Sequence, residues 1–214
     1  MTRTGLVVAK YKEDISWLSE VPDKIKVYVY DKSGEFEDAL DTGHFLIENE
    51  GRDPGTFLYH IVKNYDNLDD YTYFAQGWPF DHCGRENFFA KLNSGIEQDY
   101  AELGDTVFNV VGNGSLLTGN LELTQVFKAI TGKEQLSFEF VWGMQIMLSK
   151  RLILCRPKSF YESLLKRTIE LYKDTRTLPL AENWNEICRR VCFAYQPQKE
   201  KQDDKKKTTK KSRP

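Results

Sequence analysis

The sequence lacks the features that several large protein classes require. Its four cysteines include no CxxC pair, which argues against a disulfide framework or a structural zinc site. No apolar run approaches the roughly 18 residues of a membrane-spanning helix, and the run at residues 6–9 is too short for a secretory signal. The glycine motifs of P-loop ATPases, dinucleotide enzymes and triad hydrolases are also missing. We therefore expect a globular protein of a reducing compartment, the cytoplasm.

The near-neutral net charge combines two regions of opposite sign. Thirty Lys and Arg residues against 32 Asp and Glu give a formal charge of −2 over 214 residues. Residues 199–214 carry eight basic and three acidic residues and no aliphatic or aromatic side chain, so this segment cannot form a core. We expect one domain at residues 1–195 and a disordered basic tail or linker at 196–214. A nucleic-acid arm is the alternative for the tail, but the acidic body argues against a general nucleic-acid binder.

Hydrophobic patterning predicts an α/β domain with a mostly parallel sheet. Strands are expected at 6–9 and 25–30 around a short helix at 13–18, which is the pattern of a βαβ unit. Further strands are expected at 71–75, at 106–111 and on both sides of a bend within 138–148. Helices are expected after Asp53-Pro54, taken as N-cap and first helical residue, around 126–130, from Pro157, and at 184–192, with Cys188 and Cys192 as buried thiols.

Polar residues follow the predicted strands, and others lie in the loop before the helix that is expected after Asp53-Pro54. Ligands of parallel sheets bind beyond the carboxyl ends of the strands. Tyr11 offers a ring on which a base can stack, and Lys10, Lys12 and Arg52 can meet the charge of a diphosphate. Asp31 can accept hydrogen bonds from ribose hydroxyls. Each residue alone is more typical of a solvated surface, so their convergence on one sheet edge is what predicts a nucleotide site.

The turn at residues 76–82 contains two large aromatic residues and a proline, where an ordinary loop would be small and polar. Asp81 and His82 are adjacent oxygen and nitrogen donors, and a carboxylate at a strand end is a usual ligand of Mg²⁺ or Mn²⁺. The alternative is that Trp78 and Phe80 pack into the core while Asp81 caps the next segment. The sequence alone leaves both interpretations open.

Five separated segments carry a family resemblance that spans about residues 5–190. They are VVAKYKEDISWL at 7–18, GR at 51–52 with YHIVKNYDNL at 59–68, FAQG and PFDH within 74–82, WGMQIMLS at 142–149 and RPKSFY at 156–161. These segments resemble the motifs of a family long catalogued as of unknown function, whose members look like GT-A glycosyltransferases. The chain length and lysine-rich end are also similar to the N-terminal domain of a multidomain chlorella-virus protein of capsid glycan synthesis.

The resemblance implies a GT-A-like, Rossmann-like single domain with a central, mostly parallel mixed sheet flanked by helices. It implies transfer of a sugar from a UDP-sugar, such as UDP-glucose or UDP-rhamnose, to a glycan or glycoprotein acceptor, with Mn²⁺ or Mg²⁺ as cofactor. A viral origin would place the protein in the host cytoplasm, with further C-terminal domains possible. We expect the nucleotide site to comprise Ala9, Lys10, Tyr11, Lys12, Asp31, Arg52, Gln76 and Gly77, with Asp81 as the metal ligand.

The sequence departs from the family pattern at Trp78, where relatives carry the first acid of the metal motif in QGDPFDH. Asp81 is the matched carboxylate that remains, so a metal would need diphosphate oxygens and water as its other ligands. An inverting transfer also requires a carboxylate base, for which Glu139 and Glu182 are the candidates. Either glutamate could instead be a surface charge or a helix-start charge.

Two other functions stay open at this point. A metal-dependent phosphohydrolase or nuclease would need clustered acids, whereas Asp81 is the one compelling acid of the turn. A non-catalytic carbohydrate-binding domain is compatible with the altered metal motif. The transferred sugar, the acceptor and the stereochemical outcome are not specified by the sequence.

Overall fold

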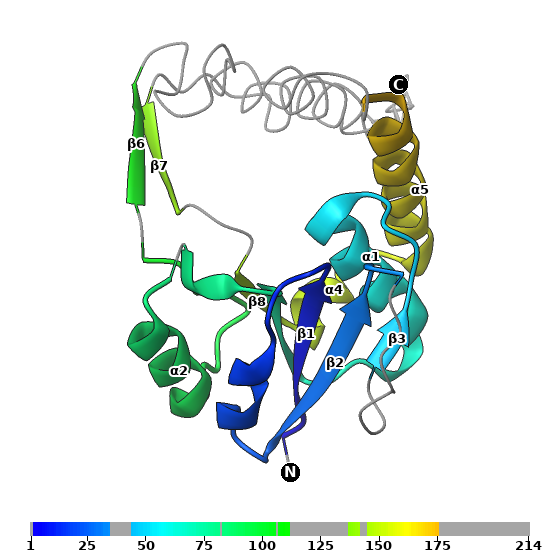
Figure 1. Cartoon of the computed structure of the whole chain (residues 1–214). Helices are drawn as coiled ribbons and strands as arrows, with labels where there is room; N and C mark the ends of the chain where they lie inside the picture. Colours follow the sequence, from blue (N-terminus) through cyan, green and yellow to red (C-terminus); the bar gives the residue numbers. More distant parts are fainter. Residues whose placement is uncertain are drawn as a thin grey trace, which may run out of the picture.

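A computed structural model describes residues 2–34, 44–81, 83–105, 107–111, 137–141 and 145–175. In this part of the chain the fold is mixed α/β, with a six-stranded sheet in the order β3-β2-β1-β4-β8-β5 and a separate two-stranded sheet (Figure 1). The strands of the large sheet are β1 (Thr4–Lys10), β2 (Ile25–Asp31), β3 (His44–Leu46), β4 (Tyr71–Gln76), β5 (Tyr100–Glu102) and β8 (Ile146–Ser149). The two-stranded sheet pairs β6 (Val107–Val111) with β7 (Ser137–Val141).

The large sheet is parallel over four strands and antiparallel at one side. Strands β3, β2, β1 and β4 run parallel, whereas β8 runs antiparallel to both β4 and β5. The expected α/β class with a mixed sheet is therefore confirmed, as are the strands near 106–111 and on both sides of the bend within 138–148. Chain order reverses at β1, because β2 pairs on one of its edges and β4 on the other. Such a reversal is the topological switch point at which α/β sheets bind ligands.

The sheet is buried on both faces, which explains the unbroken apolar run of β1. Leu6 and Val8 face one core, and Val7 and Ala9 face the other, as the alternation of side chains along a strand requires. The first core includes Trp17 of the 3₁₀ helix η1 (Ser16–Glu20) and residues of α2 (Arg85–Ser94). The second core packs under α1 (Arg52–Asn64) and the short helix α4 (Lys150–Ile153), with α5 (Lys158–Thr175) against α1.

The start of α1 differs from the sequence prediction. Gly51, not Asp53, is the N-cap residue, and it adopts the left-handed conformation with φ 68°. A Cβ atom on Gly55 would lie 2.7 Å from the carbonyl oxygen of Glu50, so glycine permits the tight entry into the helix. The helix thus begins two residues earlier than expected, and Pro54 fits because the first N–H groups of a helix lack intrahelical partners anyway. The Asp53 carboxylate is left to make contacts across the sheet.

Several predicted features lie outside the described residues. These are the helices around 126–130 and 184–192 with both of their cysteines, and the basic tail. The expected helix after Pro157 is confirmed as α5, and the short helix after β1 is the 3₁₀ helix η1. None of the helices in the described segments is long and apolar enough to span a membrane.

Candidate functional site

Four elements place polar side chains together at the switch point of the sheet. The carboxyl ends of β1, β2 and β4 lie side by side because the three strands are parallel and in direct register. The first turn of α1 contacts them through Asp53, which bonds to Lys32 and Gln76. Lys10 pairs with Asp31 across β1 and β2, and Ala9 pairs with Gln76 across β1 and β4. The predicted nucleotide-site residues from separate motifs therefore converge on this edge.

Asp31 is held in place by two neighbours. Its Oδ2 accepts a hydrogen bond from the Lys10 ammonium at 2.5 Å, and its Oδ1 accepts from the backbone and hydroxyl of Ser33 at 2.8 and 2.7 Å. Burial alone would raise the pKa of Asp31, but the hydrogen bonds and the Lys10 charge together hold it below the ordinary value. Asp31 is thus a fixed acceptor, and the charge of Lys10 is largely balanced by it.

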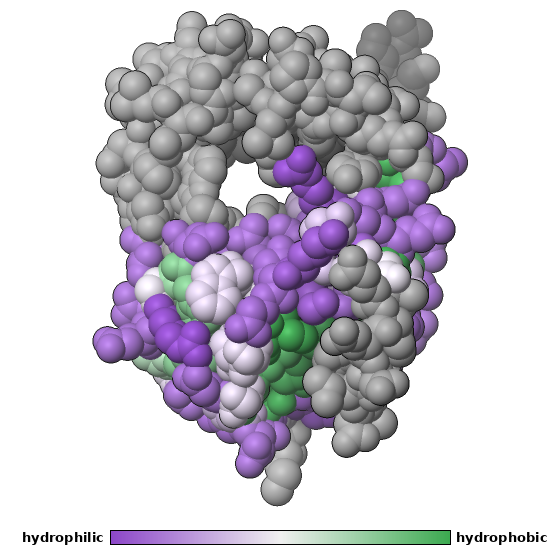
Figure 2. Space-filling model, in the orientation of Figure 1, coloured by the Kyte–Doolittle hydropathy of each residue, from purple (hydrophilic) through white to green (hydrophobic). Residues whose placement is uncertain are grey.

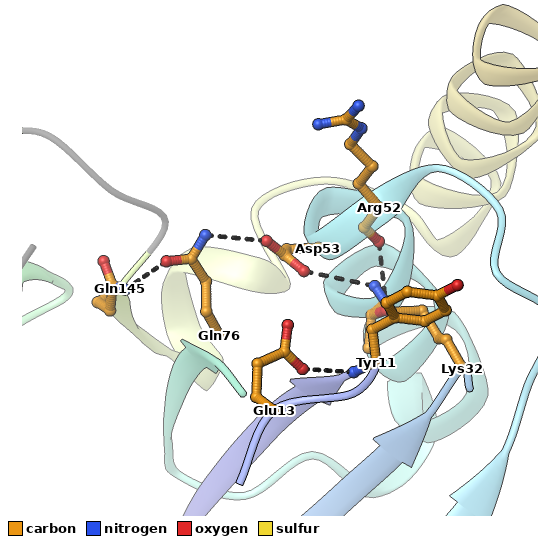
Figure 3. Close-up of polar contacts among 8 residues, drawn as sticks. Tyr11, Glu13, Lys32, Arg52, Asp53, Gln76 and Gln145 are labelled. Carbon is orange, nitrogen blue, oxygen red and sulfur yellow. Dashed lines mark hydrogen bonds and ion pairs between the residues drawn. The ribbon is translucent and has the colours of Figure 1, made fainter. Parts of the chain in front are cut away.

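A chain of hydrogen bonds crosses the site from β2 to β8 (Figure 3). Lys32 is buried, and its ammonium lies 3.3 Å from Oδ1 of Asp53. The other oxygen of Asp53 accepts from Nε2 of Gln76 at 3.0 Å, and Oε1 of Gln76 accepts from Nε2 of Gln145 at 2.8 Å. Burial lowers the pKa of Lys32, while the nearby carboxylates of Asp53 and Glu13 oppose that shift.

Glu13 lies directly against the turn that follows β4. Its carboxylate accepts from the backbone N–H of Tyr11 at 2.6 Å. A Cβ atom on Gly77 would lie 2.5 Å from Oε2 and 3.1 Å from Cβ of Glu13, so the glutamate would have to shift to admit a side chain at position 77. The indole of Trp17 donates to the carbonyl of Gly77 at 2.8 Å. The loop after β1 and the turn after β4 are therefore fixed relative to each other.

Exposed or half-buried side chains border this network of hydrogen bonds. The Tyr11 ring is 41% exposed, and Lys12 Nζ lies 5.5 Å from the centre of that ring. Arg52 has a positive φ of 51°, unusual for a residue with a Cβ atom, and its side chain extends away from the sheet (Figure 3). Figure 2 shows hydrophilic residues gathered over the ends of β1 and β2, with a hydrophobic strip nearer the middle of the same face. The surface around the site is thus largely polar, and the Tyr11 ring is exposed on it.

The turn after β4 divides between the core and the surface. Phe80 packs edge-on against Trp17 at 5.7 Å between ring centres, whereas Trp78 is 37% exposed and touches Phe80 at 4.9 Å. Asp81 ends the 3₁₀ helix η3 (Pro79–Asp81) and is exposed. It does not cap α2, whose backbone N–H at Gly84 donates instead to Asp105 at 3.0 Å. The alternative that Trp78 and Phe80 both pack into the core while Asp81 caps the next segment is therefore confirmed for Phe80 alone.

The fit of a divalent cation rests on Asp81. Within the described ranges, no group of three or more His, Cys, Asp or Glu side chains is arranged to hold a metal ion. A single exposed carboxylate suits Mg²⁺ or Mn²⁺ only where phosphate oxygens and water complete the coordination sphere. Asp81 therefore fits a metal that arrives with a diphosphate ligand, rather than a metal held by protein groups alone.

The two candidate bases are not part of the described cluster. Glu139 lies on β7 in register with Asn109 of β6, in the two-stranded sheet, and its side chain is outside the described residues. Glu182 and the predicted metal donor His82 also lie outside them. Ala9 is 2% exposed and belongs to the core under α1.

The structure adds four residues to the predicted set. Glu13 and Lys32 directly follow Lys12 and Asp31, which the sequence predicts in the nucleotide site, and Asp53 is predicted only as a helix cap. Gln145 lies in the motif after the bend, where an isolated Gln in an apolar strand was the available signal. A polar residue that interrupts such a strand is informative because buried polar groups need partners.

The comparisons with known proteins bear on the same region. A family model described as a protein of unknown function (DUF3431) matches residues 6–91. That span contains β1 to β4, α1 and η3, so the chain is similar to this family over the strand ends at the switch point. A search of curated proteins found no match.

Proposed function

We propose that this protein is a glycosyltransferase with a GT-A-like fold, which transfers a hexose from a UDP-sugar to a glycan or glycoprotein acceptor. One observation supports the proposal above the others. Tyr11, Asp31, Arg52 and Gln76, which come from four separate segments of the chain, converge at the carboxyl ends of β1, β2 and β4, where the sheet has its switch point. That position is where doubly wound sheets bind nucleotides.

The nucleotide half of the donor has defined partners in this proposal. The exposed ring of Tyr11 offers a stacking face for uracil, and Asp31 is a fixed acceptor for ribose hydroxyls. Lys12 and Arg52 supply positive charge for the diphosphate, with arginine able to bind two oxygens at once. Because Lys10 is already paired with Asp31, its part is to orient that carboxylate.

The chemistry requires the leaving UDP to be stabilised as its negative charge grows. Asp81 would hold Mn²⁺ or Mg²⁺, which when bound would screen the charge of the diphosphate. Lys12 lies in the loop after β1, Arg52 begins α1, and Asp81 ends η3 after β4, so all three belong to the same end of the sheet. An inverting transfer would also need a carboxylate that takes the proton of the acceptor hydroxyl, and Glu139 and Glu182 remain the candidates.

The wider context belongs to the same proposal. The resemblance in the sequence supports a viral protein of capsid glycan synthesis that works in the host cytoplasm. The described fold and the charge distribution favour a sugar nucleotide over a nucleic acid as the phosphate-bearing ligand, because the body of the chain is acidic.

Isothermal titration calorimetry with UDP, GDP and CMP, each with Mn²⁺, tests the proposal. The account expects UDP to bind more tightly than the other two nucleotides, and to bind more weakly without the metal. Equal binding of all three nucleotides, or binding of none, would contradict it.

A further inference from the structure

The oxygen of the Gln145 side chain is buried and lacks a hydrogen-bond partner. Gln145 is 2% exposed, and its Oε1 is one of two buried polar side-chain atoms in the described residues without a partner. The other is the hydroxyl of Thr72, within β4. A buried acceptor without a partner costs about 1–3 kcal/mol. Gln145 lies beside the polar cluster at the strand ends, whereas Thr72 does not, so a ligand of that cluster could supply the donor that its oxygen lacks.

The orientation of the amide follows from the groups beside it. Asp53, paired with the ammonium of Lys32, is a carboxylate and can only accept hydrogen bonds. Gln76 must therefore present its NH₂ group to Asp53, which leaves its oxygen for the neighbouring amide. Gln145 in turn must give its NH₂ group to Gln76, which leaves its own oxygen pointing away from Gln76. The Lys32–Asp53 ion pair at one end of this row of hydrogen bonds thus determines the orientation of both amides.

The buried oxygen of Gln145 points toward the side of the site that a donor sugar would occupy. Figure 3 shows the Gln145 oxygen pointing away from Gln76, on the side of the sheet toward which Arg52 extends. Gln145 precedes β8, on the opposite flank of β4 from the nucleotide-binding candidates Tyr11 and Asp31. A ligand that placed its base near Tyr11 and its diphosphate near Arg52 and Asp81 would direct its sugar toward β8.

We propose that Gln145 is a specificity-determining residue, whose side-chain oxygen accepts a hydrogen bond from one hydroxyl of the donor sugar. This inference rests on the proposed function and adds the chemical group that the site recognises. Because the oxygen can only accept, it selects a hydroxyl and disfavours an ether, a fluorine or a deoxy position there. A site that hydrogen-bonds a hydroxyl rejects analogues that lack it, since its own polar group is then left unpaired.

The test compares the affinities of UDP and of UDP-hexoses, so that the nucleotide and sugar contributions are separated. Calorimetry would measure UDP, UDP-glucose and UDP-rhamnose on the unmodified chain and on Gln145→Met, which keeps the side-chain length and removes the amide. We expect Gln145→Met to weaken the better-bound UDP-hexose about tenfold while the affinity for UDP changes less than twofold. Thr72→Val removes the other unpartnered oxygen, near the amino end of β4 and away from the carboxyl ends of the strands, and should leave both affinities unchanged.

A scan on the unmodified chain covers the case in which Gln145→Met fails to fold. UDP-hexose analogues that each lack one hydroxyl should bind normally except for one, which loses about tenfold. Equal affinity of all the analogues, or an equal loss of UDP and UDP-hexose in Gln145→Met, would overturn the role of Gln145 while the proposed function stands. Failure of the unmodified chain to bind UDP or either UDP-hexose would overturn the proposed function, and the inference with it.

Discussion

The ammonium of Lys32 lies 3.3 Å from the carboxylate of Asp53, although the lysine side chain is only 3% exposed. A buried lysine without a partner would lose its proton or unfold its surroundings. The pair joins the end of β2 to the first turn of α1, and through Asp53 it orients the amides of Gln76 and Gln145. One ion pair therefore contributes both to the stability of the fold and to the hydrogen-bonding pattern of the site.

Replacement of Asp53 by Ala should lower the free energy of unfolding by about 3 kcal/mol, because it leaves the buried Lys32 uncompensated. Urea denaturation measures this. The double variant Asp53→Ala/Lys32→Met should recover much of the loss. Asp66→Ala is the matched control, since Asp66 pairs with Lys158 at an exposed site, and it should cost less than about 0.5 kcal/mol. Equal costs for the two Asp variants would show that the Lys32 pair contributes no more than a surface pair.

Gly77→Ala should destabilise the protein by about 2 kcal/mol, because the new Cβ would overlap the Glu13 carboxylate. Adding Glu13→Ala should make the Gly77→Ala substitution much less costly, which a double-mutant cycle by thermal or urea unfolding would detect. Gly84→Ala serves as the control, since its added Cβ would lie 3.4 Å from Asp105, an ordinary contact. Additive effects of the Gly77 and Glu13 substitutions would contradict the proposed contact.

His60 should make stability depend on pH between about 3 and 6.5. It is 1% exposed and its Nδ1 lies 2.9 Å from the Tyr30 hydroxyl. Burial, with smaller effects from Lys63 and Lys26, lowers its pKa to about 3. The unfolded chain therefore binds a proton that the folded chain does not, so stability falls as pH drops below about 6.5.

Between pH 6.5 and pH 5 the free energy of unfolding should fall by about 2 kcal/mol more for the unmodified chain than for His60→Gln, at about 1.4 kcal/mol per pH unit. Urea unfolding at the two pH values compares the two slopes, and each protein serves as its own reference for any loss of packing. Parallel pH dependence of the two proteins would show that His60 titrates normally in the fold.

Tyr11→Ala should weaken UDP binding about tenfold, since stacking of a base on an aromatic ring contributes about 1–3 kcal/mol. Stability should change little because the ring is exposed. Tyr100 is similarly exposed, at 47% against 41% for Tyr11, but lies on the edge strand β5. Tyr100→Ala is thus the control and should bind UDP normally in calorimetry. A loss of affinity in both variants, or in neither, would argue against a stacking role for Tyr11.

The sequence predicted the central part of the fold better than the site. The unbroken apolar run of residues 6–9 identifies β1, because a strand buried on both faces needs apolar residues at every position. The β-branched and tyrosine residues of 25–30 identify β2, although Lys26 interrupts them. The start of α1 was misplaced because Asp53-Pro54 matches a common cap pattern, whereas Gly51 and Gly55 enable an earlier start that depends on contacts with Glu50. Local patterns do not record such contacts between loop and helix.

The residues of the candidate site also fall into those that local sequence patterns indicate and those that depend on distant contacts. The positions of Tyr11 and Asp31 at the carboxyl ends of β1 and β2 could be predicted because both strands are recognisable in the sequence. Glu13, Lys32 and Gln145 could not, since their importance comes from partners far away in the sequence: the Gln76–Gln145 bond, for example, joins residues 69 positions apart. Pairings of that kind emerge only when the strand order and register are known.

Hydrolysis of sugar nucleotides in the absence of an acceptor tests the central claim most directly. With Mn²⁺, the unmodified chain should release UDP from UDP-glucose or UDP-rhamnose, and NMR would identify the anomer of the freed sugar. Asp81→Asn should lower the rate at least about tenfold, whereas Asp23→Asn, which changes an exposed acid before β2 at the opposite end of the sheet, should not. Equal rates for Asp81→Asn and the unmodified chain, or cleavage of an oligonucleotide without release of UDP from any UDP-hexose, would contradict the account.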